Sequence, residues 1–166
     1  MQLQEFFDYK NQIMEDMLTS ERIVKLINEN TPMDEAGSLM YTQVFPYEYL
    51  PDTIEDSRTL VCVDVDIQGT DYGKIFLQPV LYVWTLVHRS KMRLPEGGVR
   101  SDALCSEICK KVNGSMMYGM GQLDLYSVKR FAPMTDYNGK MMVFHAREWS
   151  KQYNPDKYIP ANRKMG

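Results

Sequence analysis

The chain has 166 residues, of which 44% are hydrophobic and 25% are charged, and its formal net charge is -3. These proportions are typical of a folded globular protein, exclude an intrinsically disordered chain, and allow one hydrophobic core of ordinary size. The slight acidity excludes a protein that attracts nucleic acid over its whole surface, so any binding of anions has to be local.

The cysteines and histidines give no sign of a disulfide framework or a metal site. Cys62, Cys105 and Cys109 are expected to pack as small apolar side chains in a reducing compartment. His88 and His145 stand at no ligand spacing to them, so we expect no zinc and no other cofactor. The sequence also has no apolar run of about 18 residues and no basic-then-apolar start, so neither a membrane span nor a secretion signal is expected.

The first thirty residues have the apolar spacing of helices. One apolar stripe runs from Leu3 to Leu18, and a second begins after Thr19 or Ser20, either of which is a good N-cap. We expect these helices to cover one face of a sheet. Residues 30–58 then contain three prolines and several large aromatic side chains, which is typical of a loop pinned to its own core or to a neighbouring subunit.

Two strands are predicted next. Residues 60–67 alternate, with Val61, Val63 and Val65 on an apolar face and polar residues among those on the other. Residues 74–88 are apolar on both faces and predict a long or broken strand, in which Pro79 marks an edge or a bulge.

A helix and a hairpin follow. Ser101 is the predicted N-cap of a helix that ends at Asn113-Gly114. Residues 123–131 and 141–149 then read as two strands, and the Asn-Gly pair at 138–139 predicts the turn between them.

This order predicts an α+β fold with a mainly antiparallel sheet of about four strands and helices packed on one face. The predicted sequence of elements is one or two helices, two strands, a helix, two strands and a tail. We expect residues 1–150 to form a single domain and residues 151–166 to form an extended C-terminal tail.

The acidic residues do not make a convincing catalytic site. Asp64 to Gly69 begins like a calcium loop, but Ile75 stands where the loop requires a glutamate. Asp52, Asp64 and Asp66 could imitate a metal-dependent nuclease, but Gln68 stands where that pattern needs a lysine. We therefore expect no enzyme, and a small metal-dependent hydrolase or binding domain is kept only as an alternative.

The element order resembles the tail terminator family of long-tailed bacteriophages, and the stretches that carry the resemblance are residues 21–30, 44–67, 81–114 and 123–149. The resemblance implies a structural virion protein that forms a homomeric, hexameric ring at the head-tail junction, ends the tail tube and joins it to the head. Its partners would be further copies of itself, the tail tube protein and a head-completion or connector protein. It would be assembled in the host cytoplasm. Another neck component, such as a head-completion or connector protein, is the alternative.

The resemblance also suggests roles for three groups of residues. The expected subunit contacts, on an exposed aromatic loop, are Phe45, Tyr47, Tyr49 and Leu50. The expected contacts of the C-terminal tail with a neighbouring protein are Tyr153, Tyr158 and Ile159. A basic loop before the third helix carries Arg89, Lys91, Arg93 and Arg100. In the lumen this loop would meet DNA phosphates without reading sequence; facing axially it would pair with acidic residues of a neighbouring ring; otherwise its charges are merely solvated.

Overall fold

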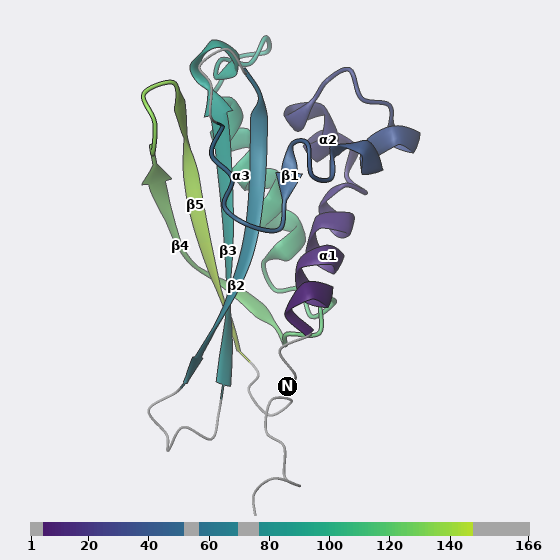
Figure 1. Ribbon diagram of the computed structural model, residues 1–166, viewed down its shortest axis with the longest axis vertical. Helices are drawn as coiled ribbons and strands as arrows, with labels where there is room; N and C mark the ends of the chain where they lie inside the picture. The colour runs from purple at the N-terminus through teal and green to yellow at the C-terminus, as the bar shows by residue number, and fades with distance from the viewer. Residues whose placement is uncertain (1–4, 52–56, 70–76, 148–166) are drawn as a thin grey trace, which may run out of the picture.

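The computed structural model describes residues 5–51, 57–69 and 77–147. A five-stranded sheet has the strand order β1-β2-β3-β5-β4, and three α-helices lie on one side of it (Figure 1). The helices are α1 (Glu5–Met17), α2 (Glu21–Ile27) and α3 (Arg100–Val112), with short 3-10 helices η1 (Met33–Leu39) and η2 (Arg89–Lys91). The strands are β1 (Val44–Phe45), β2 (Thr59–Gly69), β3 (Leu77–His88), β4 (Leu123–Phe131) and β5 (Tyr137–Ala146).

The predicted α+β class and the predicted order of helices and four main strands are confirmed, but the sheet has five strands and is mixed, and the predicted tail, residues 151–166, lies outside the described residues. The additional strand, β1, runs parallel to β2 and pairs only Val44 with Val61 and Phe45 with Cys62. A strand of two residues has no periodicity for a sequence pattern to reveal. It forms because Val61 N donates a hydrogen bond to the Gln43 carbonyl at 2.8 Å, which joins the loop to the edge of β2.

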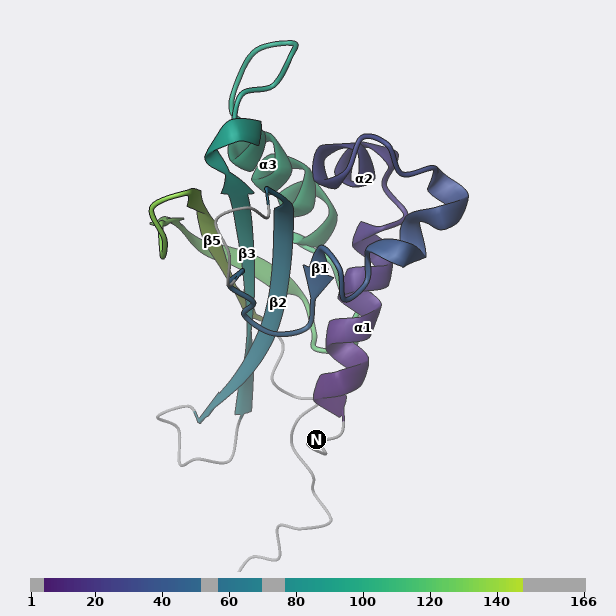
Figure 2. The same ribbon diagram turned by 45° about the horizontal axis from the view of Figure 1, so that its top comes forward.

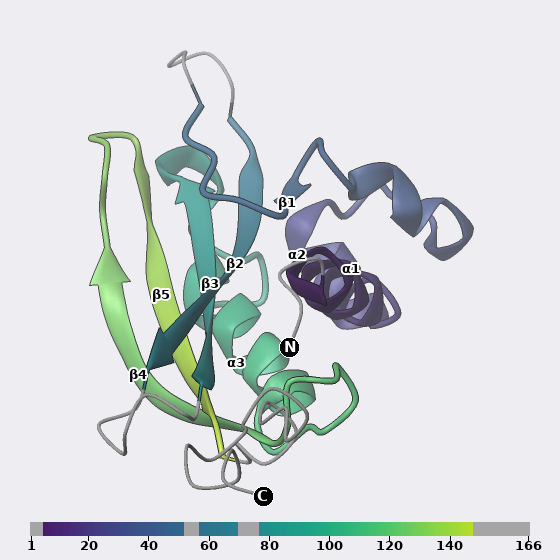
Figure 3. The same cartoon turned by 60° about the horizontal axis from the view of Figure 1, so that its bottom comes forward.

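The predicted alternation along β2 is confirmed, because the sheet buries both of its faces. Val61 and Val63 belong to the large cluster that the three α-helices cover, whereas Leu60 and Cys62 belong to a second cluster on the opposite face. Figure 3 shows α1, α2 and α3 on the same side of the sheet, as predicted. The cluster on the opposite face consists of Phe45, Leu60, Cys62, Trp84, Leu86 and Tyr137.

The C-terminal hairpin was predicted correctly, but its turn was not. β4 and β5 are antiparallel, and residues 132–136 connect them, so Asn138 and Gly139 lie inside β5 and pair with β3. A Cβ atom on Gly139 would stand 1.5 Å from the Thr85 carbonyl oxygen. This glycine is therefore required by close approach of two backbones rather than by a turn.

Two helix starts and Pro79 test the local predictions. Ser20 is the N-cap of α2, as one of the two predicted caps, and its Oγ accepts a hydrogen bond from Ile23 N at 3.4 Å. The prediction of Ser101 as N-cap of α3 was wrong, because Val99 occupies that position without a side-chain cap and Ser101 is buried in the first turn. Pro79 pairs with β2 just before β3 meets β5, where a missing N–H costs no hydrogen bond to β5.

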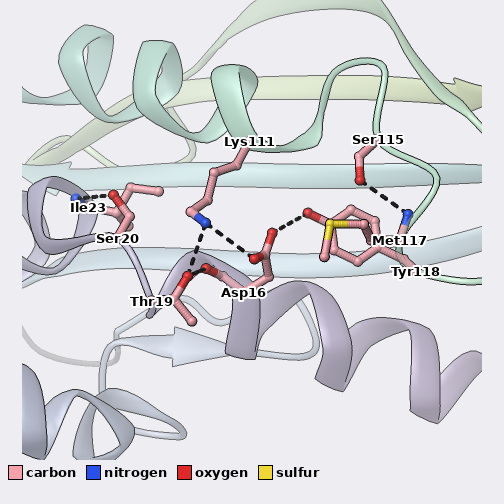
Figure 4. A network of polar contacts seen from close by, with 8 residues as sticks. All are labelled: Asp16, Thr19, Ser20, Ile23, Lys111, Ser115, Met117 and Tyr118. Atoms are coloured by element: carbon pink, nitrogen blue, oxygen red, sulfur yellow. Dashed lines mark hydrogen bonds and ion pairs between the residues drawn. The ribbon is translucent and has the colours of Figure 1, made fainter.

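A polar cluster ties α1 to α3 and to the connection after α3 (Figure 4). Asp16 accepts hydrogen bonds from Tyr118 Oη at 2.6 Å and from Lys111 Nζ at 3.2 Å. Lys111 also donates to Thr19 Oγ1 at 3.0 Å, and Thr19 Oγ1 donates to the Asp16 carbonyl at 2.6 Å. The carboxylate thus joins three segments that are far apart in the sequence.

We expect Asp16→Ala to lower the free energy of unfolding by about 1–3 kcal/mol, because Tyr118 and Lys111 lose a shared acceptor and the Tyr118 hydroxyl is left largely buried. Urea denaturation of both proteins measures the difference. Glu15→Ala removes the neighbouring exposed carboxylate and serves as the matched control. Equal midpoints for the two variants would contradict a stabilising role of the cluster.

The weakly acidic thiol and phenol groups that the fold buries predict a loss of stability at alkaline pH. Burial raises the pKa of the Cys62 thiol from 9.0 to about 11 and the pKa of Tyr9 from 10.0 to about 12, and it raises that of Tyr118 as well. The unfolded chain releases these protons at lower pH than the folded chain, so stability is complete below about pH 9 and falls as the pH rises towards 12.

Denaturation midpoints measured between about pH 8 and 11 test this expectation. We expect the first part of the decline, from about pH 9, to be weaker in Cys62→Ala than in the unsubstituted chain, because the variant lacks one of the three thiols whose pKa burial raises from 9.0. An unchanged pH profile in the variant would assign the decline to other groups.

Candidate interaction surfaces

The acidic residues considered for metal chemistry are engaged elsewhere. The Asp64 carboxylate forms an ion pair with Lys10 Nζ at 2.6 Å. Asp66 lies beside Tyr82, whose pKa is raised by burial and by this carboxylate. Asp52 lies outside the described residues. Over the described ranges, no group of three or more His, Cys, Asp or Glu side chains could hold a metal ion.

The aromatic loop after β1 packs inward at two of its four predicted contact residues. Phe45 is buried and stacks on the half-buried Tyr49, with ring centroids 4.2 Å apart and planes 10° from parallel. The Arg58 guanidinium lies over the ring of Tyr49, 5.7 Å from its centroid. The loop is therefore not exposed along its whole length: of the four predicted contact residues, Tyr47 and Leu50 face solvent.

An open edge of the sheet lies at β4, which sequence analysis did not single out. β4 pairs with β5 on one side, and no described strand pairs with its other side. A register shift between Leu125 and Ser127 leaves Tyr126 as an extra residue, whose ring stacks on His145 at 4.2 Å. Tyr126 is 70% exposed, Val128 48% and Leu125 36%. Exposed apolar side chains on an unpaired edge are typical of a strand that contacts another chain.

The opposite end of the sheet is covered in part. β1 pairs with the first part of β2, and Lys10 of α1 reaches both Asp64 and the Pro46 carbonyl, the latter at 2.9 Å. The two ends therefore differ in chemistry: β4 exposes apolar residues followed by Lys129 and Arg130, whereas the aromatic loop exposes Tyr47, Glu48 and Leu50. No sequence pattern separates an edge strand from a central one in this chain, because the order of strands is a property of the sheet.

The four basic residues of the predicted loop are in different situations. Arg100 turns inward, where Nε donates to the Lys91 carbonyl at 2.8 Å and a terminal nitrogen donates to the Leu26 carbonyl at 2.9 Å. Arg89 pairs with Asp136 at 3.1 Å. Lys91 and Arg93 are exposed, and their side chains have no hydrogen bond or ion pair within the described part of the chain.

The basic loop is anchored rather than loose. Leu94 is 5% exposed and belongs to the core on the helix side of the sheet. The backbones of Arg93 and Val99 form an isolated antiparallel β-bridge. Gly97 and Gly98 have φ angles of 97° and 94° and allow the chain to reverse at the tip. Figure 2 shows the loop projecting past the ends of the sheet and helices. The predicted tail contacts Tyr153, Tyr158 and Ile159 lie outside the described residues.

Comparison with known proteins gives a family. The model of the YomW family matches residues 20–146, and the chain belongs to this phage-associated family. No curated protein matches the chain. One similar solved chain comes from a structure described as "Virion of native gene transfer agent (GTA) particle", with 12% identity, a TM-score of 0.48, and coverage of 81% of this chain and 89% of that chain. The expected resemblance is thus confirmed as far as a phage-associated family, and not as far as the tail terminators.

The inward position of Arg100 predicts a structural role that Arg93 lacks. We expect Arg100→Ala to lower the free energy of unfolding by about 1–3 kcal/mol, because the Leu26 carbonyl loses a charged donor. Arg93→Ala, which removes an exposed side chain, should change it by less than about 0.5 kcal/mol. Urea denaturation compares the two variants, and equal losses would refute this distinction.

Proposed function

We propose that this member of the YomW family is a structural protein of a phage virion that forms a homomeric ring of six copies at the head-tail junction. The ring would end the tail tube and join it to the head. The observation that carries the proposal is the edge of β4, which no other described strand covers and where Leu125, Tyr126 and Val128 are exposed.

A contact between β4 of one copy and the aromatic loop of the next copy would bury the exposed side chains at both ends of the sheet. Tyr126 and Val128 would be buried against Tyr47 and Leu50. Lys129 and Arg130 would lie near Glu48, which gives the contact opposite charges. Because the two surfaces differ and lie at opposite ends of the sheet, each added copy leaves one of each free, and such a contact closes into a ring or continues as a filament.

Such a ring would have a structural role in the virion that requires no catalytic activity. One face would fit the last ring of the tail tube protein, and the other would fit a head-completion or connector protein, so that growth of the tube ends. We propose that residues 151–166, with Tyr153, Tyr158 and Ile159, contact a neighbouring protein, and that the ring is assembled in the host cytoplasm. A head-completion or connector role uses the same ring and differs in which neighbour it binds.

The oligomer tests the β4 contact. Light scattering over a micromolar concentration series should give a discrete species near six chain masses for the unsubstituted protein. Val128→Glu places a charge in the contact and should give monomers, whereas Met117→Ser, at a position that is 75% exposed on another surface, should leave the oligomer intact. Loss of the oligomer in both variants, or in neither, would refute the β4 contact.

Purified tail tubes test the position of the ring. A terminator should bind to one end of the tubes and stop their elongation when tube protein is added. A ring that binds no tube but binds head-completion protein would assign the chain to another place in the neck.

A further inference from the structure

A cavity of about 240 Å³ lies between the end of α2, the start of β2 and the basic loop. Its lining includes three basic side chains, Lys91, Arg93 and Arg100, and a single acidic one, Glu29. The cavity is therefore electropositive, although the chain as a whole carries a net charge of -3. Thr59, the first residue of β2, also lines it, and we call this cavity the Thr59 pocket.

The Thr59 hydroxyl is an unexplained buried polar group at the wall of this pocket. Thr59 is 1% exposed, and its Oγ1 has no hydrogen-bond partner among the described residues. A buried hydroxyl without a partner costs about 1–3 kcal/mol, so native proteins rarely keep one unless a ligand or water satisfies it. Because Thr59 lines a basic cavity, a ligand there that accepts hydrogen bonds would satisfy this hydroxyl.

The backbone around the Thr59 pocket is arranged so that it does not repel an anion. α2 ends at the pocket, and the free carbonyls of a helix C-terminus would oppose negative charge. Gln43 Nε2 donates to the carbonyls of Ile27 and Thr59, both at 3.1 Å, and Arg100 donates to that of Leu26. Three carbonyl oxygens near the pocket, those of Leu26, Ile27 and Thr59, are therefore occupied by donors.

The basic side chains of the pocket are divided between a fixed and a free set. Two nitrogens of Arg100 are held by the carbonyls of Lys91 and Leu26, which fixes the plane of its guanidinium beside the cavity. Lys91 and Arg93 have no partner within the described part of the chain, and both line the pocket. A fixed guanidinium, two free cations and a hydroxyl form a donor set that suits a phosphate oxyanion.

We infer that the Thr59 pocket binds a phosphate group, with Thr59 donating through its hydroxyl and Lys91, Arg93 and Arg100 neutralising the charge. The phosphate comes either from the backbone of nucleic acid or from free inorganic phosphate. The inference does not rest on the ring, because every residue of the pocket belongs to one chain. It favours phosphate contact over the axial and the merely solvated roles of the basic loop.

Calorimetric titration of the full chain with inorganic phosphate, against sodium chloride of equal ionic strength, tests the pocket. Thr59→Val keeps the shape of the side chain and removes the hydroxyl. It should weaken phosphate binding about tenfold and leave the protein without ligand at least as stable, because an unsatisfied group is lost. Lys91→Ala with Arg93→Ala should weaken binding more, and Arg89→Ala, outside the pocket, should not change it.

Fluorescence anisotropy with a labelled DNA duplex of mixed sequence distinguishes the two sources. Binding that falls with salt and is weakened by Thr59→Val would identify nucleic acid as the source. Phosphate binding with no DNA binding would identify free phosphate. Absence of both, or binding that Thr59→Val leaves unchanged, would overturn the inference. The same measurements on Val128→Glu separate this result from the fate of the ring.

Discussion

The buried side chain of Gln43 is the interaction on which the arrangement of the domain depends. Its amide nitrogen holds the last carbonyl of α2 and the first carbonyl of β2, and its oxygen accepts a hydrogen bond from Asn28. Its own carbonyl starts the pairing of β1 with β2. One residue of a loop thus joins a helix end, a strand start and the additional strand, and two of the residues whose carbonyls it binds, Ile27 and Thr59, line the Thr59 pocket. A substitution here would leave several buried polar groups unpaired at once.

The two edges of the sheet are covered to different extents, and the proposed contact between copies rests on this difference. At one end, β1 and Lys10 cover part of the edge of β2, because β1 pairs with Val61 and Cys62 and Lys10 binds Asp64 and the Pro46 carbonyl. At β4 nothing among the described residues does so, and apolar side chains stand beside an unpaired backbone. Natural proteins usually protect such edges, so one that stays open is most simply explained by a partner that covers it.

The two proposed surfaces are compatible with one another because they lie on different parts of the domain. The β4 edge is one end of the strand order, whereas the Thr59 pocket lies where β2 begins, beside α2 and the basic loop. Copies could therefore contact each other through β4 while every pocket stays accessible. In such a ring the pockets would repeat around the axis, and each would contribute local positive charge although the chain is acidic overall.

The sequence by itself determined the local features: the α+β class, the order of the main elements, the N-cap at Ser20, and the alternation of β2 that divides its side chains between two clusters. These follow from periodicity and from the hydrogen-bonding needs of neighbouring residues, which are encoded within a few positions. Only the tertiary structure decided that Phe45 is buried, that Gly139 lies in a strand, that Arg100 turns inward while Lys91 stays free, and that β4 is an edge. Each of these depends on contacts between segments distant in the chain, such as Thr85 with Gly139 or Leu26 with Arg100, and local patterns carry no information about which distant backbone will approach.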